Sequence, residues 1–153
     1  MEKLDSEFRH ALDTAARHAI SHIETLDQSS VAATVDVETL RSRLRRQLND
    51  AAVPADQVID DLVRDVEGGL IGSAGGRFFG WVIGGVLPAA LAADWMTSAW
   101  QQNAALYATS PAAAVVEEVV GDWLKDLLNL PQSASFALVT GCQMAHVTCL
   151  AAA

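Results

Sequence analysis

Residues 135–153 have the pattern of one short strand running into a helix. This feature restricts the possible folds of the chain more than any other. The apolar residues 136–139 predict the strand, and Thr140, Gly141 and Cys142 predict a tight turn of small residues before the helix. One strand cannot form a sheet, and no other segment has comparable strand character. We therefore predict an α/β protein, truncated here, in which the part present is mostly α-helical and carries the first strand and helix of the larger domain.

The end of the chain supports the same expectation. The final helix ends in Leu150 and three alanines, without a Gly, Asn or Pro stop signal and without a basic last turn. We expect the natural sequence to continue past Ala153.

Charge is distributed unevenly along the chain. Of the 29 charged residues, 22 lie in positions 1–67. The net charge of −9 argues against nucleic acid as a partner, because phosphate binding needs an excess of Lys and Arg. We predict a surface-rich helical segment over 1–70 and the start of a larger domain over 71–153. The apolar second part is expected to expose large patches in isolation.

Apolar periodicity and capping residues predict five helices before the final one. Their expected ranges are 4–26, 37–49, 54–67, 88–108 and 111–129. Residues 72–87 are rich in glycine and are predicted to form turns and extended segments. Trp95, Trp100 and Trp123 are interpreted as core residues.

Several features of the sequence limit the cellular location of the protein and the kinds of binding site that it can have. The N-terminus lacks the apolar region of a secretory signal, so we expect a cytoplasmic protein. The uncharged stretch 78–93 is shorter than the roughly 20 residues that span a bilayer, so no membrane association is expected. His18 and His22 have the spacing of a metal-binding pair, but a solvated helix surface is the favoured interpretation. No metal site is predicted.

The turn at Thr140–Gly141 predicts an anion site. Backbone N–H groups and the positive end of the helix dipole point at whatever lies above such a turn, most often a phosphate. His146 could reach the same anion, or pack beside the strand. Cys142 is an alternative candidate nucleophile with His146 as its base, although packing beside a cofactor is the favoured interpretation.

Three segments in order resemble the pyridoxal-phosphate-dependent group II decarboxylases of fold type I, which include the aromatic-amino-acid and glutamate decarboxylases. The segments are GGRFFGWVIGGVLPAALAADW at 75–95, SPAAAVVEEVVGDWLKDLLNLP at 110–131 and SFALVTGCQMAHVTCLAAA at 135–153. They cover about half of the chain, and their joint order is more specific than any one alone. The resemblance implies a homodimer that removes the carboxylate of an amino acid, with an N-terminal helical segment exchanged between subunits.

The resemblance also implies roles for individual residues. Pyridoxal 5'-phosphate would be bound through its phosphate at Gly141, Cys142, Gln143 and His146. Phe78, Phe79 and Trp81 would line the substrate entrance near the dimer interface. Gln143, Met144 and His146 depart from the hydroxyl, Glu and Asn or Thr residues of the family pattern, and Gly75-Gly76 replaces its His-Pro, which puts the substrate class in doubt.

The lysine that holds the cofactor as a Schiff base is not evident in this sequence. Its two lysines, Lys3 and Lys125, stand outside the family's context for that residue. The chain alone is therefore expected to be inactive, with no catalytic residue of its own. The alternatives are another fold type I enzyme, such as an aminotransferase or lyase, or a non-catalytic helical remnant that forms dimers.

Overall fold

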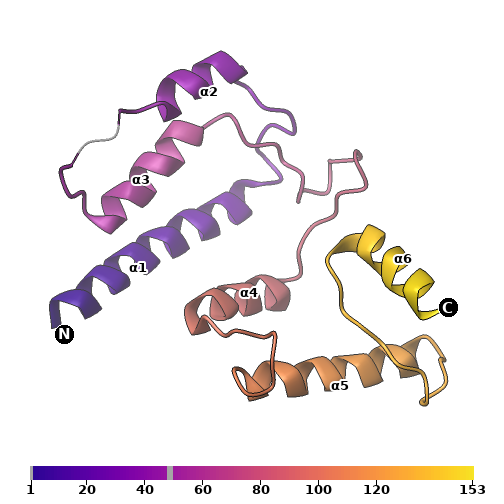
Figure 1. Cartoon of the computed structure of the whole chain (residues 1–153). Coiled ribbons are helices and arrows are strands. Elements are labelled where there is room, and N and C mark those ends of the chain that lie inside the picture. The colour runs from indigo at the N-terminus through magenta and orange to yellow at the C-terminus, as the bar shows by residue number, and fades with distance from the viewer. Residues whose placement is uncertain (1, 48–49) are drawn as a thin grey trace. The chain divides into compact units, whose positions relative to one another are not determined.

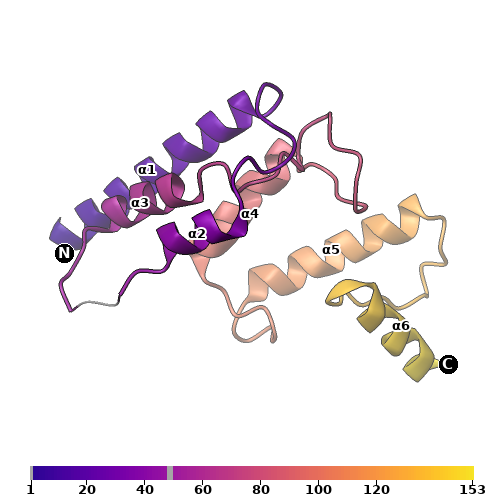
Figure 2. The same ribbon diagram turned by 90° about the horizontal axis from the view of Figure 1, so that it is seen from above.

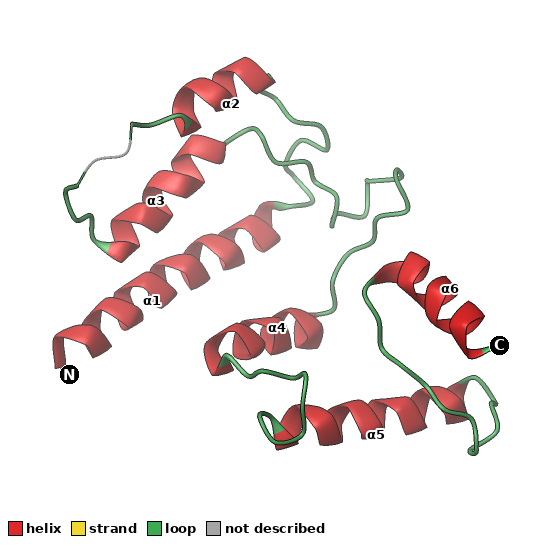
Figure 3. Ribbon diagram, in the orientation of Figure 1, coloured by secondary structure: helices red, strands yellow, loops and turns green. Residues whose placement is uncertain are grey.

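The computed structural model describes residues 2–47 and 50–153, with side chains from residue 6 onward. Helices follow one another through these residues and loops connect them (Figures 1 and 3). The helices are α1 (Glu2–Thr25), α2 (Val37–Leu44), α3 (Ala55–Val66), α4 (Pro88–Trp100), α5 (Pro111–Leu127) and α6 (Gly141–Ala152). They fall into two compact units, Met1–Leu87 and Pro88–Ala153.

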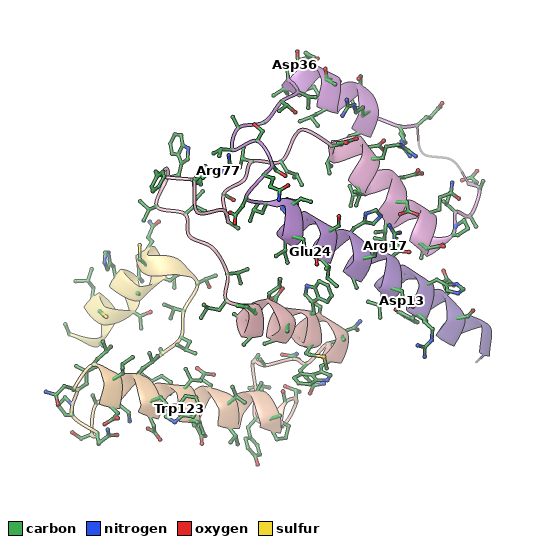
Figure 4. All side chains as sticks on the ribbon, turned by 180° about the vertical axis from the view of Figure 1, so that it is seen from behind. Asp13, Arg17, Glu24, Asp36, Arg77 and Trp123 are labelled. Carbon is green, nitrogen blue, oxygen red and sulfur yellow. The ribbon has the colours of Figure 1, made fainter. Side chains whose placement is uncertain are left out.

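In the first unit, α3 packs against both α1 and α2. The helices α1 and α3 run side by side in both views of the ribbon (Figures 1 and 2). Two residues of α1 hold one carboxylate of α3: His18 Nε2 lies 2.5 Å from Asp60 Oδ1, and Arg17 Nη2 lies 3.2 Å from the same oxygen. Figure 4 shows Arg17 on α1 near α3. Charge therefore fixes the register of α1 on α3.

A second cluster of charges joins the end of α2 to α3. Arg46 pairs with Asp61 at 3.2 Å and also with Asp65, which is a buried carboxylate. Arg64 binds Asp61 at 2.7 Å from one helical turn away. The hydrogen bond from Arg64, followed by that from Arg46, lowers the pKa of Asp61 below its ordinary value. Arg46, which follows α2, therefore lies against an acidic face of α3.

The contact between α1 and α3 predicts a pH dependence. Hydrogen bonds from His18 and then Arg17 lower the pKa of Asp60 below its ordinary value of 3.8. A depressed folded-state pKa means that the contribution of Asp60 to stability is present above the ordinary value and is lost as the pH falls through the lower folded value. The protection of α1 and α3 amides, measured relative to their intrinsic exchange rate at each pH, should fall on acidification in this window. Asp60→Asn should lower this protection modestly already at neutral pH, as expected for an exposed ion pair, and should flatten the acid response.

The control for this prediction is Asp27→Asn, which removes one exposed acidic charge that follows α1. It should leave both the neutral exchange rate and the acid response unchanged. If hydrogen exchange were the same in Asp60→Asn and Asp27→Asn, the proposed contribution of Asp60 to the contact between α1 and α3 would be contradicted.

The linker after α1 and the glycine-rich loop after α3 are held together by main-chain contacts. The Thr34 N–H donates to the Gly68 carbonyl at 2.7 Å. Arg77 Nη2 donates to the Ser29 carbonyl at 2.5 Å (Arg77 is labelled in Figure 4). The loop is irregular through 67–87, and the described residues there form turns without a helix, as its glycine content predicted.

In the second unit, α5 begins where the sequence predicted. Ser110 is 1% exposed, and its side chain accepts a hydrogen bond from the Ala113 N–H at 3.4 Å, while Pro111 occupies the first helical turn. Ser and Pro at these positions satisfy a free N–H and preset the backbone of the first turn. The local sequence is sufficient to explain this helix start.

Ser110→Ala should weaken the first turn of α5 by about 1 kcal/mol, because the N-cap hydrogen bond is lost. Hydrogen exchange of the first turn of α5 should accelerate several-fold, whereas Ser110→Thr, which retains an uncharged accepting oxygen, should exchange closer to the native rate. Unchanged exchange in the alanine variant would show that the cap contributes nothing.

The prediction that the tryptophans are core residues is wrong for this chain. Within the described residues, no hydrophobic side chain is buried. Trp123 is 69% exposed, and Trp95 and Trp100 are also exposed (Trp123 is labelled on α5 in Figure 4). An apolar helix becomes a core element only when another element covers it. The expectation of exposed apolar patches is confirmed.

Three other structural predictions need correction. Residues 136–139 are not a strand, and no strand occurs in 2–47 or 50–153, because a strand needs a neighbour to complete its hydrogen-bond ladder. The helix expected to reach residue 108 ends at Trp100, where Gln101 takes a left-handed φ of 49°. The second helix ends at Leu44, and positions 48 and 49 of its expected range lie outside the described residues.

None of the helices in the described ranges combines the length and apolar character needed to cross a membrane.

Candidate functional site

The candidate anion site is the N-terminal end of α6. The helix starts at Gly141, directly after Thr140, so the predicted turn into a helix is confirmed. Gly141 has a φ of +74°, a left-handed conformation that L side chains adopt only with strain. Glycine has no side chain, and no atom lies within 4 Å of the point where a Cβ at Gly141 would be. The backbone at this position is therefore accessible.

The first turn of α6 keeps its N–H groups available. The Thr140 side chain makes no capping hydrogen bond, and no acidic residue occupies the first turn. In contrast, Asp36 caps α2 through the Thr39 N–H at 2.8 Å. This hydrogen bond lowers the pKa of Asp36. An uncapped helix end without a carboxylate suits an external anion, because the N–H groups and the helix dipole are both unopposed.

The residues predicted to bind the cofactor lie together on this end of α6. Cys142 and Gln143 are exposed in the first turn, and His146 is exposed one turn further on, four residues after Cys142. Residues four apart share one helix face, so Cys142 and His146 lie on the same side of α6. An exposed turn with a free thiol, an amide and an imidazole offers hydrogen-bond donors to an anion. The residues present therefore fit a phosphate group.

The predicted substrate-entrance residues lie in the first unit, in the loop after α3. Phe79 is 93% exposed and Trp81 is 85% exposed, whereas Phe78 is half-buried against its own loop. Trp81 has a left-handed φ of 60°. The apolar surfaces of Phe79 and Trp81 are therefore available for another segment or a ligand.

One histidine of the α1 pair, His18, has a structural partner. His18 is bound to Asp60, and within the described residues no group of three or more His, Cys, Asp or Glu side chains is arranged to hold a metal ion. His18 thus serves the contact between α1 and α3.

Sequence reasoning missed a cluster that leads into α6. Gly121 and Lys125 are buried on one face of α5, four residues apart, and both contact Phe136. A Cβ at Gly121 would overlap the Phe136 ring. Lys125 Nζ lies 5.9 Å from the centre of that ring. The only signal in the sequence was a glycine and a lysine at helical spacing on an otherwise apolar helix.

Comparison with known proteins now identifies the family. The model of the pyridoxal-dependent decarboxylase conserved domain matches residues 38–152. The match includes α2 to α6 and therefore both groups of predicted site residues. It confirms the resemblance that was drawn from the three sequence segments.

Individual relatives agree with this match. An aromatic-L-amino-acid decarboxylase of Catharanthus roseus is 24% identical over 131 residues, covering 86% of this chain and 26% of the relative. An aromatic-L-amino-acid decarboxylase of Bacillus atrophaeus is 25% identical over 134 residues, covering 88% and 28%. Tryptophan decarboxylase 1 of Oryza sativa is 28% identical over 125 residues, covering 82% and 24%.

The chain spans about a quarter of the length of these curated relatives. The family model matches three quarters of the chain, and the matched region includes the three sequence segments. This match decides the classification of the chain. The chain belongs to the pyridoxal-dependent decarboxylase family.

Proposed function

We propose that this chain is the N-terminal portion of an enzyme that decarboxylates an amino acid with pyridoxal 5'-phosphate. The observation that carries the proposal is the uncapped N-terminus of α6, where Gly141 opens the backbone within a region that matches the family. The relatives whose names describe aromatic amino acids or tryptophan favour an aromatic substrate.

The contribution of this chain is binding and orientation. The N–H groups of Gly141, Cys142 and Gln143 would hold the cofactor phosphate, and His146 would add a side-chain donor on the same face. Pyridoxal phosphate, when bound, supplies the electron-withdrawing ring that the reaction needs. Phosphate binding at α6 would fix the position of the cofactor chiefly through backbone N–H groups, whose charge does not change with pH.

Phe78, Phe79 and Trp81 are proposed to line the substrate entrance in the assembled enzyme. Exposed aromatic side chains provide apolar surface and ring faces to an aromatic amino acid. Their exposure in the first unit is consistent with a position that other parts of the enzyme cover.

The assembled protein is proposed to be a cytoplasmic homodimer with the fold type I α/β architecture. Residues 1–70 would form the N-terminal helical segment exchanged between subunits, and residues 71–153 the start of the cofactor-binding domain. The exposed apolar faces of α5 support this, because Leu127 is 79% exposed and Trp123 is exposed on the same helix. Residues outside this chain would cover these faces and supply the lysine.

The test is purification of the protein from its native source, followed by measurement of its intact mass and of amine release from tryptophan and other aromatic amino acids. The proposal expects a mass several times 16.2 kDa and release of the amine with loss of carbon dioxide. Transfer of the amino group to a keto acid would instead favour an aminotransferase. A mass of 16.2 kDa without cofactor binding would favour a non-catalytic remnant that forms dimers.

A further inference from the structure

The segment that delivers α6 is fastened to α5 at one point. Lys125 Nζ donates a hydrogen bond to the Gln132 carbonyl at 3.2 Å, and it forms an ion pair with Asp122 Oδ1 at 2.9 Å. The same ammonium group lies 5.9 Å from the centre of the Phe136 ring. One side chain of α5 thus contacts both ends of residues 132–136.

The burial of Lys125 shows that this fastening is specific. Lys125 is only 9% exposed, although lysine is among the residues that are almost never buried without partners. A buried ammonium group loses hydration, which is offset here chiefly by the Gln132 carbonyl and the Phe136 ring face, since the exposed Asp122 carboxylate adds little. A residue that only filled space between α5 and the segment would not need an N–H donor.

Gly121, one helical turn before Lys125 on the same face of α5, makes a second contact with the ring. It is buried, and the Phe136 ring occupies the volume where a side chain at Gly121 would begin. Phe136 therefore contacts both the α5 backbone at Gly121 and the Lys125 side chain. Thr140, the residue that precedes α6, lies only four positions after Phe136 in the sequence.

We propose that Lys125 is a positioning residue for the phosphate site at the N-terminus of α6. This inference rests on the proposed function, because the phosphate assignment comes from there. Backbone N–H groups bind a phosphate only when their directions converge, so the placement of the segment before Gly141 decides the affinity. Lys125 sets that placement by holding the Gln132 carbonyl and the Phe136 ring.

The experiment compares the native protein with Lys125→Met, Lys125→Arg and Asp122→Asn in the full-length enzyme. Lys125→Met keeps the length of the side chain and removes the donor and the charge. Lys125→Met should raise the Kd for pyridoxal phosphate about tenfold, because a small displacement of binding groups is costly. Lys125→Arg should restore the Kd to within about threefold of the native value, since a guanidinium also donates and lies over aromatic rings.

Two further readouts separate positioning from a general loss of structure. Hydrogen exchange of residues 132–143 should accelerate in Lys125→Met while exchange within α5 stays native. The KM for the amino acid at saturating cofactor should not change. Asp122→Asn is the matched control and should behave as the native protein does, because Asp122 is exposed and its ion pair contributes little.

The inference would be overturned if the Kd of Lys125→Met lay within about twofold of the native value, because a surface substitution would give a change of that size. Failure of Lys125→Arg to restore binding while α5 stays native would also overturn it. If Lys125→Met does not accumulate, Lys125→Gln retains an N–H donor on a shorter side chain and should give an intermediate Kd. A native protein that binds no pyridoxal phosphate would contradict the proposed function instead, and exchange of 132–143 would still test the role of Lys125.

Discussion

Gly141→Asp is expected to weaken the binding of pyridoxal phosphate by at least about a hundredfold, or about 2.7 kcal/mol. The added carboxylate would stand at the helix end that is proposed to hold the phosphate. Two unit charges 4 Å apart repel by about 4 kcal/mol at an effective dielectric constant of 20. The left-handed φ of Gly141 adds strain of about 1–2 kcal/mol for a residue with a side chain.

An uncharged variant separates these two causes. Gly141→Asn introduces a side chain of the same size, and Asn tolerates the left-handed conformation better than most residues. It should weaken binding by less than about tenfold, as expected when strain alone remains. The aspartate variant should keep α6 folded, because a negative charge stabilises a helix N-terminus. Equal affinities of Gly141→Asp and the native protein in a cofactor titration would remove the phosphate site from α6.

Gly121→Ala is expected to destabilise the contact between α5 and the segment before α6 by about 1–3 kcal/mol. The new methyl group would occupy the position of the Phe136 ring, which must then move away from both α5 and Lys125. This effect opposes helix propensity, because alanine in a helix interior is favoured over glycine by about 1 kcal/mol. Hydrogen exchange of residues 132–143 should accelerate at least several-fold.

A double-mutant cycle tests whether the effect of Gly121→Ala depends on the Phe136 ring. In the Phe136→Ala background the ring is absent, so Gly121→Ala should no longer disrupt a contact and should slow exchange within α5 through helix propensity alone. The same substitution would then destabilise one background and stabilise the other. Acceleration of equal size in both backgrounds would contradict the packing of Phe136 on Gly121.

The local features of this chain could be predicted from its sequence because their causes are local. Ser110 and Pro111 mark the start of α5, and Gly141 marks the start of α6, through capping and backbone preferences that act within one turn. The family resemblance added the candidate phosphate and substrate residues. The structure places the first group together on one end of α6, and their roles remain proposals.

The remaining features depend on partners that periodicity does not identify. The contact of Lys125 with Gln132 and Phe136 joins a helix to a loop, and no spacing rule connects these residues. Trp123 has the pattern of a core residue but is exposed, because the surface that would cover it is not supplied by the described part of the chain. Residues 136–139 likewise have the composition of a strand but no neighbouring strand. The sequence pattern of a segment shows which structure that segment prefers. Whether the segment packs in that structure depends on the element that covers it or pairs with it.

The most direct test of the central claim is equilibrium binding of pyridoxal phosphate to the protein from its native source, after removal of any cofactor carried through purification. The account predicts saturable binding of one cofactor per chain. The absence of saturable binding would contradict two proposals, that the N-terminus of α6 binds phosphate and that the protein is a pyridoxal-phosphate-dependent decarboxylase.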